Sequence, residues 1–104
     1  MQLDDLKYTE HGSIAVISFD EKDQKVNTLG SRFFPQFELI FQKIESAKNI
    51  VGIVIISEKK DCFVAGADIR ELLRAETQDE VRQLSIQGQE FLNRLEELDK
   101  PVVA

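Results

Sequence analysis

The fold is decided by Cys62-Phe63-Val64-Ala65-Gly66-Ala67-Asp68-Ile69-Arg70-Glu71-Leu72, a stretch that comes after the apolar run Val51–Ile56. This order predicts a buried strand, then a loop of small residues around Gly66, then a helix. Backbone N–H groups at such a loop and helix N-terminus stabilise developing negative charge, so the loop can form half of an oxyanion hole. The alternative interpretation is a tight turn in which Gly66 only supplies conformational freedom.

Two further blocks flank this loop. Upstream lies Lys25-Val26-Asn27-Thr28-Leu29, and downstream lies Lys100-Pro101-Val102-Val103-Ala104. Together with residues 63–72, they resemble three motifs of the crotonase (enoyl-CoA hydratase/isomerase) superfamily, in the same order and spacing. These motifs are a K-A-L-N-A-L turn, F-x-A-G-A-D-[IL]-x-E-[LM] and a K-P-[VI]-[VI]-A-A strand entry. The blocks extend over almost the whole chain, and three independent matches are more specific than one.

The resemblance implies an α/β fold, namely the N-terminal portion of a crotonase-like β-β-α repeat. In that family, a second glycine-rich loop and both catalytic carboxylates follow the Lys-Pro-Val-Val-Ala block, whereas this sequence ends at Ala104. We therefore expect residues 1–104 to be one N-terminal fragment of an enoyl-CoA hydratase/isomerase domain. Without the resemblance, the residues indicate only an open α/β sheet.

Charge and composition exclude some function classes. The formal net charge is −6 over 104 residues and the longest basic run is Lys59-Lys60, so the sequence lacks the basic face that nucleic acids require. The single cysteine, Cys62, lies beside Phe63 and is interpreted as a small buried residue. The only histidine, His11, is interpreted as a surface turn residue, and no metal site is predicted.

The N-terminus predicts neither export nor membrane insertion. Residues 1–6 are acidic and lack the apolar segment of a secretory signal, and their two acids disfavour a transit peptide. No apolar run approaches the length that spans a bilayer. The expected location is a bacterial cytoplasm, with a mitochondrial matrix as the alternative.

Strand patterns dominate the first half of the chain. Residues 7–10 and 14–19 flank His11-Gly12 and predict a hairpin. Both faces of its second strand are largely apolar, as expected of a strand covered on both sides. The polar residues 20–24 predict a loop, and the short β-branched run Gly52–Ser57 predicts an interior strand.

Helical periodicity marks three later segments. Within Ser31–Ala47, apolar residues at three- and four-residue steps predict one buried face, with Pro35 in or near the first turn. Residues 68–73 predict a short helix. A longer helix follows Thr77, whose spacing from Glu80 matches a capping box, and we expect its apolar face to be buried along its length. That face comprises Val81, Leu84, Gly88, Phe91, Leu92, Leu95 and Leu98.

The resemblance also implies a chemistry. Crotonase-fold enzymes bind an acyl-CoA thioester and stabilise the oxyanion or enolate at its carbonyl with two backbone N–H donors. By motif position the first donor is the N–H of Ala67, and the second belongs to the downstream glycine-rich loop. Small residues suit this loop because the thioester must approach the main chain at hydrogen-bond distance. The implied CoA-binding residues are Lys25, Val26, Ala65, Gly66, Ala67, Asp68, Ile69 and Arg70.

Charged residues near this loop have alternative interpretations. Lys25 and Arg70 stand where family members often carry basic residues near the CoA phosphates, but each can equally be a solvated charge. Asp68 can line the groove or complement the helix dipole, and we favour the helix role. Glu71 is expected to be solvated. No carboxylate falls in the family's catalytic motif, so neither a general acid nor a general base is assigned.

A finer resemblance concerns the subfamily. Residues 25–29 are more similar to the hydratase domain of multifunctional fatty-acid oxidation alpha subunits than to stand-alone crotonases. This implies hydration of trans-2-enoyl-CoA in β-oxidation, in a parent that carries an NAD-dependent 3-hydroxyacyl-CoA dehydrogenase and pairs with a thiolase subunit. An isomerase, dehalogenase, thioesterase or synthase of the same family would share these residues. The alternative from another class is a non-catalytic acyl-CoA-binding or assembly domain. We also expect the fragment to self-associate.

Overall fold

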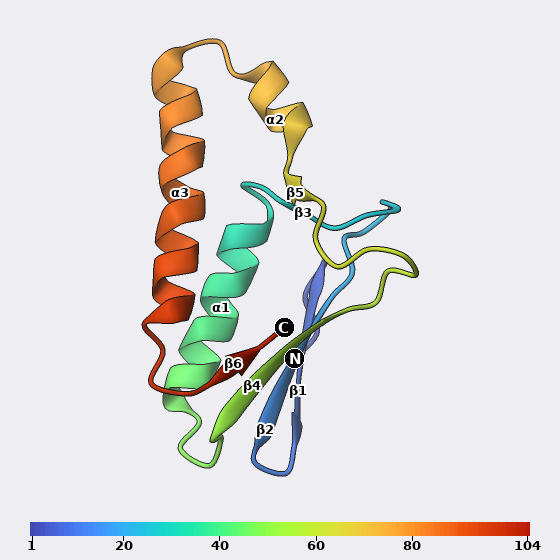
Figure 1. Cartoon of the computed structure of the whole chain (residues 1–104), viewed down its shortest axis with the longest axis vertical. Helices are drawn as coiled ribbons and strands as arrows, with labels where there is room; N and C mark the ends of the chain where they lie inside the picture. Colours follow the sequence, from blue (N-terminus) through green and yellow to red (C-terminus); the bar gives the residue numbers. More distant parts are fainter.

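The chain folds into an α/β structure around a mixed sheet of four strands, and the computed structural model describes residues 1–104 (Figure 1). Its elements are, in chain order, β1 (Leu6–His11), β2 (Ile14–Phe19), β3 (Thr28–Leu29), α1 (Phe33–Ser46), β4 (Gly52–Ser57), β5 (Gly66–Ala67), α2 (Ile69–Arg74), α3 (Gln78–Glu96) and β6 (Val102–Val103). The main sheet has the order β1-β2-β4-β6, and β3 pairs with β5 in a separate two-stranded sheet. The predicted α/β class is confirmed.

The strand pairing follows the chain order closely. β1 and β2 form the predicted antiparallel hairpin, in which Leu6 lies opposite Phe19 and Tyr8 lies opposite Ile17. β4 pairs parallel with β2, and β6 pairs parallel with β4. Parallel neighbours need a crossover connection, and the segments that contain α1 and α3 supply the two crossovers.

The core lies between α1 and one face of the sheet. The predicted apolar face of α1 is confirmed, and Pro35 lies in its first turn, where a missing N–H costs nothing. Full burial of each such side chain stabilises the fold by about 1.5–3 kcal/mol. The buried α1 residues are Phe33, Phe37, Ile40, Phe41 and Ile44, and they pack against a cluster that includes Leu6, Tyr8, Ala15, Ile17, Phe19 and Ile53.

The other face of the sheet differs from the expectation. Covering on both sides was predicted for β2, but Ile14 and Val16 are only half-buried, and neighbouring β4 exposes 39% of Ile56. The reason is that both long helices pack toward the face that carries Ala15 and Ile17. No helix packs on the opposite face of the sheet, which carries the apolar side chains of Ile14, Val16 and Ile56.

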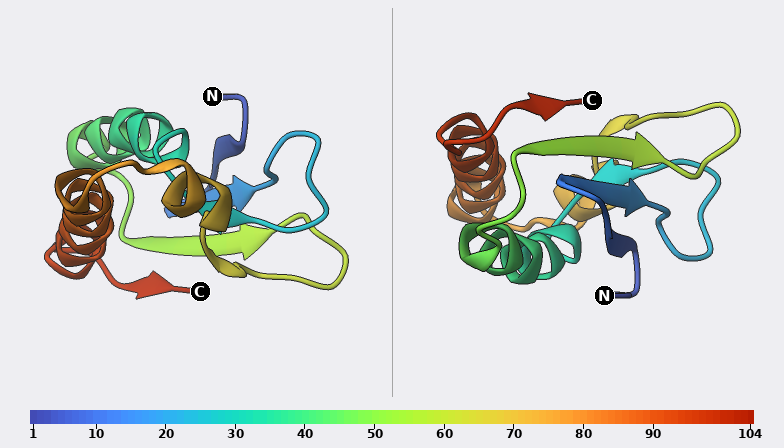
Figure 2. Two further views of the ribbon diagram at one scale, coloured as in Figure 1. Left: turned by 90° about the horizontal axis from the view of Figure 1, so that it is seen from above. Right: turned by 90° about the horizontal axis from the view of Figure 1, so that it is seen from below.

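The long helix α3 packs beside α1 through its C-terminal half alone (Figures 1 and 2). Phe91 contacts the aromatic rings of α1, with a centroid distance of 4.9 Å to Phe37, and Arg94 pairs with Glu45 at 3.1 Å. The prediction of burial along the whole helix was wrong, because no residue of α3 is fully buried. Its N-terminal half runs past the end of α1, which leaves Val81 42% exposed.

The start of α3 confirms half of the predicted capping box. The Thr77 hydroxyl accepts a hydrogen bond from the Glu80 N–H at 3.1 Å. The Glu80 carboxylate, however, accepts from the N–H of Glu76 at 2.8 Å rather than from that of Thr77. The helix still begins where the capping pattern indicated, because the side chain of Thr77 satisfies one of its free N–H groups.

None of the helices combines the length and apolar character that crossing a bilayer requires.

We expect residues 1–104 to self-associate. The outer face of β4 exposes Ile56, and at the sheet edge Val103 is 61% exposed, so both an apolar surface and an unpaired strand edge are open. A second copy can cover such surfaces by edge pairing or by exchange of an element. Light scattering over a dilution series measures this, and a stable monomer at tens of micromolar contradicts the expectation.

Candidate functional site

The loop of small residues lies beside β3, at the carboxyl end of the sheet strands. Residues 63–67 run along residues 27–29, so that Thr28 lies opposite Gly66 and Leu29 opposite Ala67 in a parallel pair. The Ala65 N–H donates to the Asn27 carbonyl at 2.8 Å, and the Asp68 N–H donates to the Leu29 carbonyl at 3.0 Å. Two of the blocks singled out in the sequence are therefore held together by main-chain hydrogen bonds.

Gly66 is needed for the path of this loop. Its φ is +135°, a conformation that side chains rarely tolerate, and a Cβ there would meet no other atom within 4 Å. Glycine is therefore required by the backbone rather than by a close approach of other parts of this chain. Both interpretations of the loop, as an oxyanion hole or as a tight turn, agree with this geometry.

Asn27 anchors the loop to the sheet. It is completely buried, and its Nδ2 lies within 3.1 Å of the Phe19 carbonyl, the Ser57 hydroxyl and the Phe63 carbonyl. Its Oδ1 accepts from the Glu21 N–H at 2.9 Å. One side chain thus joins the ends of β2 and β4 to the loops that follow them.

Sequence reasoning quoted Asn27 as a motif residue but gave it no role. The available signal was a polar residue that directly follows Val26 and lies two residues before Leu29. Buried amides are retained where their hydrogen bonds are satisfied, and those partners lie far along the chain.

A second residue that was missed, Lys59, joins the loops after β2 and β4. Its ammonium donates to the carbonyls of Glu21 and Gln24 at 2.7 and 2.6 Å and pairs with Asp20 at 2.6 Å. Figure 2 shows these two loops projecting on the same side of the molecule. These contacts of Lys59 hold residues 20–27 next to the loop that follows β4.

Asp68 is the N-cap of α2, in agreement with the favoured helix role. Its Oδ1 accepts from the Arg70 N–H at 3.0 Å and from Arg70 Nε at 3.0 Å. These hydrogen bonds to Arg70 hold the pKa of the Asp68 carboxyl below its usual value. The same pair, with a further contribution from Glu21, raises the pKa of the Arg70 guanidinium.

Arg70 is therefore ion-paired rather than free. Besides Asp68, it lies 3.6 Å from the Glu21 carboxylate, which in turn accepts from the backbone and hydroxyl of Thr28 at 3.0 Å. Any role of Arg70 toward an anionic ligand has to compete with these two carboxylates. Lys25 and Val26 are exposed on the neighbouring loop, and Ile69 is 67% exposed.

Glu71 is not the solvated carboxylate that was expected. Its Oε1 accepts from the Ser31 N–H at 2.9 Å and from the Ser31 hydroxyl at 2.7 Å, just before α1 begins. The side chain passes so close to Gly30 that a Cβ there would lie 2.8 Å from Glu71 Oε1. Glu71 thereby connects α2 to the start of α1.

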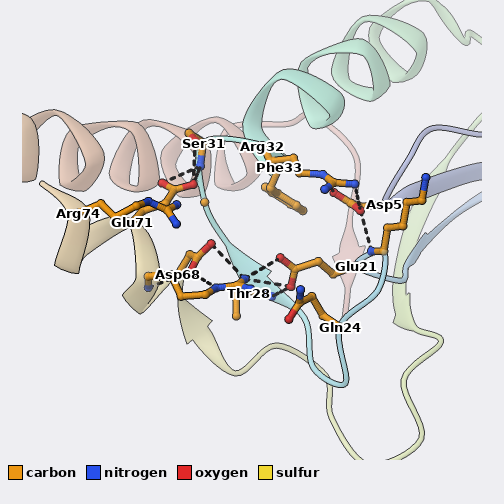
Figure 3. Close-up of a pocket in the computed structure, with 13 residues that line it drawn as sticks. Asp5, Glu21, Gln24, Thr28, Ser31, Arg32, Phe33, Asp68, Glu71 and Arg74 are labelled. Carbon is orange, nitrogen blue, oxygen red and sulfur yellow. Dashed lines mark hydrogen bonds and ion pairs between the residues drawn. The ribbon is translucent and has the colours of Figure 1, made fainter.

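A polar cavity of about 330 Å³ is lined by residues of β3, the start of α1 and α2 (Figure 3). In Figure 3, Asp5 and Arg32 lie on one side of it, Glu71 and Ser31 on another, and Glu21 with Thr28 in the middle. Asp5 is 2% exposed and pairs with Arg32 at 3.0 Å. The carboxylates that line this cavity form ion pairs or hydrogen bonds with other groups of the chain. We therefore interpret these residues as a structural support for the loop.

An apolar cavity of about 480 Å³ lies between the β3–β5 pair and α3. Leu29, Gly66 and Ala67 line one side, and α1 contributes Phe34. Leu84 and Leu92 are among the residues of α3 that line the other side. Its size falls within the range of sites that bind small molecules, about 300–1,000 Å³. The loop of small residues thus faces an apolar space.

The remaining sequence expectations concern metals and nucleophiles. No group of three or more His, Cys, Asp or Glu side chains is arranged to hold a metal ion. Cys62 is half-buried rather than buried, and His11 is exposed beside the hairpin turn with its Nε2 3.2 Å from the Thr9 hydroxyl. His11 lies in the hairpin, next to Thr9, and Cys62 has no basic side chain as a hydrogen-bond partner.

Comparisons with known proteins agree with this architecture. The fatty acid oxidation complex subunit alpha of Shewanella halifaxensis is 44% identical over 91 residues, which are 88% of this chain and 13% of that protein. The crystal structure of enoyl-CoA hydratase from Bacillus anthracis matches 94% of this chain and 38% of its own, with a TM-score of 0.84 at 19% identity. An enoyl-CoA hydratase/isomerase from Marinobacter aquaeolei matches 96% of this chain and 40% of its own, with a TM-score of 0.81 at 22% identity.

The two solved structures, at these identities, show the fold alone. The family itself is shown by the sequence, because the enoyl-CoA hydratase/isomerase family model matches residues 9–104. The chain spans only a small part of the length of the curated relatives that it matches. It belongs to the enoyl-CoA hydratase/isomerase (crotonase) family.

Proposed function

We propose that the chain is the N-terminal portion of an enoyl-CoA hydratase domain that adds water to trans-2-enoyl-CoA thioesters in fatty-acid β-oxidation. The observation that carries this is the juxtaposition of Ala67, in a loop pinned to β3, with an apolar cavity. The similarity to fatty acid oxidation complex alpha subunits supports hydration over the other reactions of the family.

In this proposal the Ala67 N–H donates to the thioester oxygen as negative charge develops on it. The Asp68 N–H is used by the Leu29 carbonyl, and successive N–H groups of an extended strand point to opposite sides. The Ala67 N–H is thereby directed away from β3, which supports its role as the donor. Removal of one such donor typically costs about 2.7–4 kcal/mol of transition-state stabilisation.

The coenzyme A part of the substrate is assigned to the surface around this loop. We propose that main-chain groups of residues 65–68 and the exposed side chain of Ile69 contact the CoA moiety, with Val26 beside them. Lys25 is the cation available to the CoA phosphates, since it forms no ion pair within the chain, whereas Arg70 has first to leave Asp68 and Glu21.

The remaining parts of the reaction are assigned to a longer protein. We assign to that longer protein the second N–H donor, the carboxylate that takes a proton from the attacking water and the carboxylic acid that donates a proton to the α-carbon. We assign no cofactor to residues 1–104, and NAD belongs to the proposed dehydrogenase domain of the longer protein. A dehydrogenase domain, a thiolase partner and a bacterial cytoplasmic location are part of the same proposal, by likeness to the alpha subunits.

The chain alone is expected to show no hydratase activity, because it holds one proposed donor and no proposed catalytic acid. Hydration of crotonyl-CoA at high protein concentration, followed by loss of the enoyl absorbance, measures this. The longer protein serves as the positive control and should turn over. Saturable turnover that copurifies with residues 1–104 contradicts the proposed division of the site. Isomerisation without hydration by the longer protein favours the isomerase alternative.

A further inference from the structure

The apolar cavity beside Ala67 has one wall formed by α3. The residues of α3 that line it are Val81, Leu84, Ser85, Gly88, Gln89 and Leu92. A helical stretch from 81 to 92 is about 16 Å long. An extended carbon chain advances about 1.2 Å per bond, so this wall matches a chain of ten or more carbons.

Gly88 is the unexpected residue on this wall. It lies inside the 19-residue helix α3, where glycine is less favourable than every residue except proline. A Cβ at this position would meet no atom within 4 Å, so the packing of the chain does not require glycine. Gly30 shows the contrast, because a Cβ there would lie 2.8 Å from a Glu71 oxygen. A side chain at position 88 would instead occupy the cavity.

The apolar side chains around Gly88 are incompletely covered. Leu92 is 55% exposed, Val81 is 42% exposed, and Leu72 on the facing helix α2 is 39% exposed. An alkyl chain that starts at Ala67 and then lies along α3 would remove their surface from water, which is favourable in proportion to the area covered. No charged side chain of α3 lines this cavity.

We propose that Gly88 sets the acyl chain length of the substrate by keeping the α3 wall open for medium- and long-chain acyl groups. The inference rests on the proposed function, because that function places the thioester carbonyl at Ala67. It adds a substrate class, acyl groups of about ten carbons and longer. It also attributes the discrimination between chain lengths to the absence of a side chain at position 88.

The test measures dissociation constants of butyryl-, octanoyl- and decanoyl-CoA by calorimetry in the longer protein that carries this chain. The wild type should bind decanoyl-CoA more tightly than butyryl-CoA. Gly88→Leu should weaken decanoyl-CoA binding roughly 10- to 60-fold, the effect of two to three methylenes left unburied, and change butyryl-CoA binding by less than about twofold. Gly88→Ala should have a smaller effect in the same direction and should raise the melting temperature, because alanine favours the helix.

Asn93→Leu is the matched control, since it adds the same side chain at an exposed position of α3 outside the cavity. It should leave all three constants unchanged. Equal weakening of all three ligands by Gly88→Leu, or no weakening of any, overturns the inference while the proposed function stands. Absence of butyryl-CoA binding in the wild type overturns both. Chain-length discrimination without hydratase turnover retains the inference and removes only the reaction.

Discussion

Ala67→Pro in the longer protein is expected to lower kcat for an enoyl-CoA thioester by at least about 10²–10³-fold, as removal of an oxyanion-hole donor does. Proline has no N–H, so the proposed donor is lost. The loss of folding stability should be much smaller, because the N–H groups of Ala65 and Asp68 bond this loop to residues 27–29, whereas the Ala67 N–H is directed away from β3. Steady-state kinetics on crotonyl-CoA, with circular dichroism to verify folding, measure the effect.

The loop offers a matched control two residues away. Ala65→Pro removes the N–H that donates to the Asn27 carbonyl at 2.8 Å, so it should destabilise the loop and lower the melting temperature. The two variants therefore separate a structural donor from the proposed catalytic one. A folded Ala67→Pro protein with near-normal kcat shows that Ala67 is not the donor.

Asn27→Ala is expected to lower the free energy of unfolding of the chain by about 3–4 kcal/mol, because it leaves several buried polar groups without partners. The Glu21 N–H loses its acceptor at 2.9 Å, and the carbonyls of Phe19 and Phe63 lose their donor. Urea unfolding followed by circular dichroism, at one fixed protein concentration, gives the value. Self-association shifts apparent stability with concentration, so that concentration must be shared by all variants.

Asn49→Ala is the control for this measurement. Asn49 is exposed, and the same change there should alter the free energy of unfolding by less than about 0.5 kcal/mol. If the two variants unfold at the same urea concentration, Asn27 does not anchor the loop. A selective loss of order in residues 60–67, with the sheet intact, would limit its role to the loop alone.

The helices and the strands of the main sheet could be predicted from local patterns, because each depends on neighbours within a few residues. The short strands β3 and β5 lie in segments that were expected as a turn and a loop, because their pairing joins residues far apart in the sequence. The five buried positions of α1 fall on the stripe that helical spacing predicts. β4 begins and ends where its β-branched run does. Family motifs added the location of the loop, since residues 25–29 and 63–72 each match by type and order.

Two of the expectations that were wrong, burial along the whole of α3 and covering of both faces of β2, have the same physical cause. Burial of an apolar face depends on whether another element packs against it. The apolar pattern of α3 resembles that of α1, yet Val81 and Leu92 face an open cavity because α3 extends past the core. Both faces of β2 are apolar in sequence, but helices pack on only one. Periodicity indicates which residues favour burial and not whether a partner is present.

The sequence by itself determined the helices, the strands of the main sheet, the family and the position of the loop around Gly66, whereas the pairing of β3 with β5 was not predicted. Only the tertiary structure decided how that loop is held and what it faces. Asn27 reaches Phe63 across 36 residues, Glu71 reaches Ser31 across 40, and Gly88 faces the cavity beside Ala67 from another helix. Such contacts depend on how distant segments pack against one another, and the local spacing of residues does not predict them.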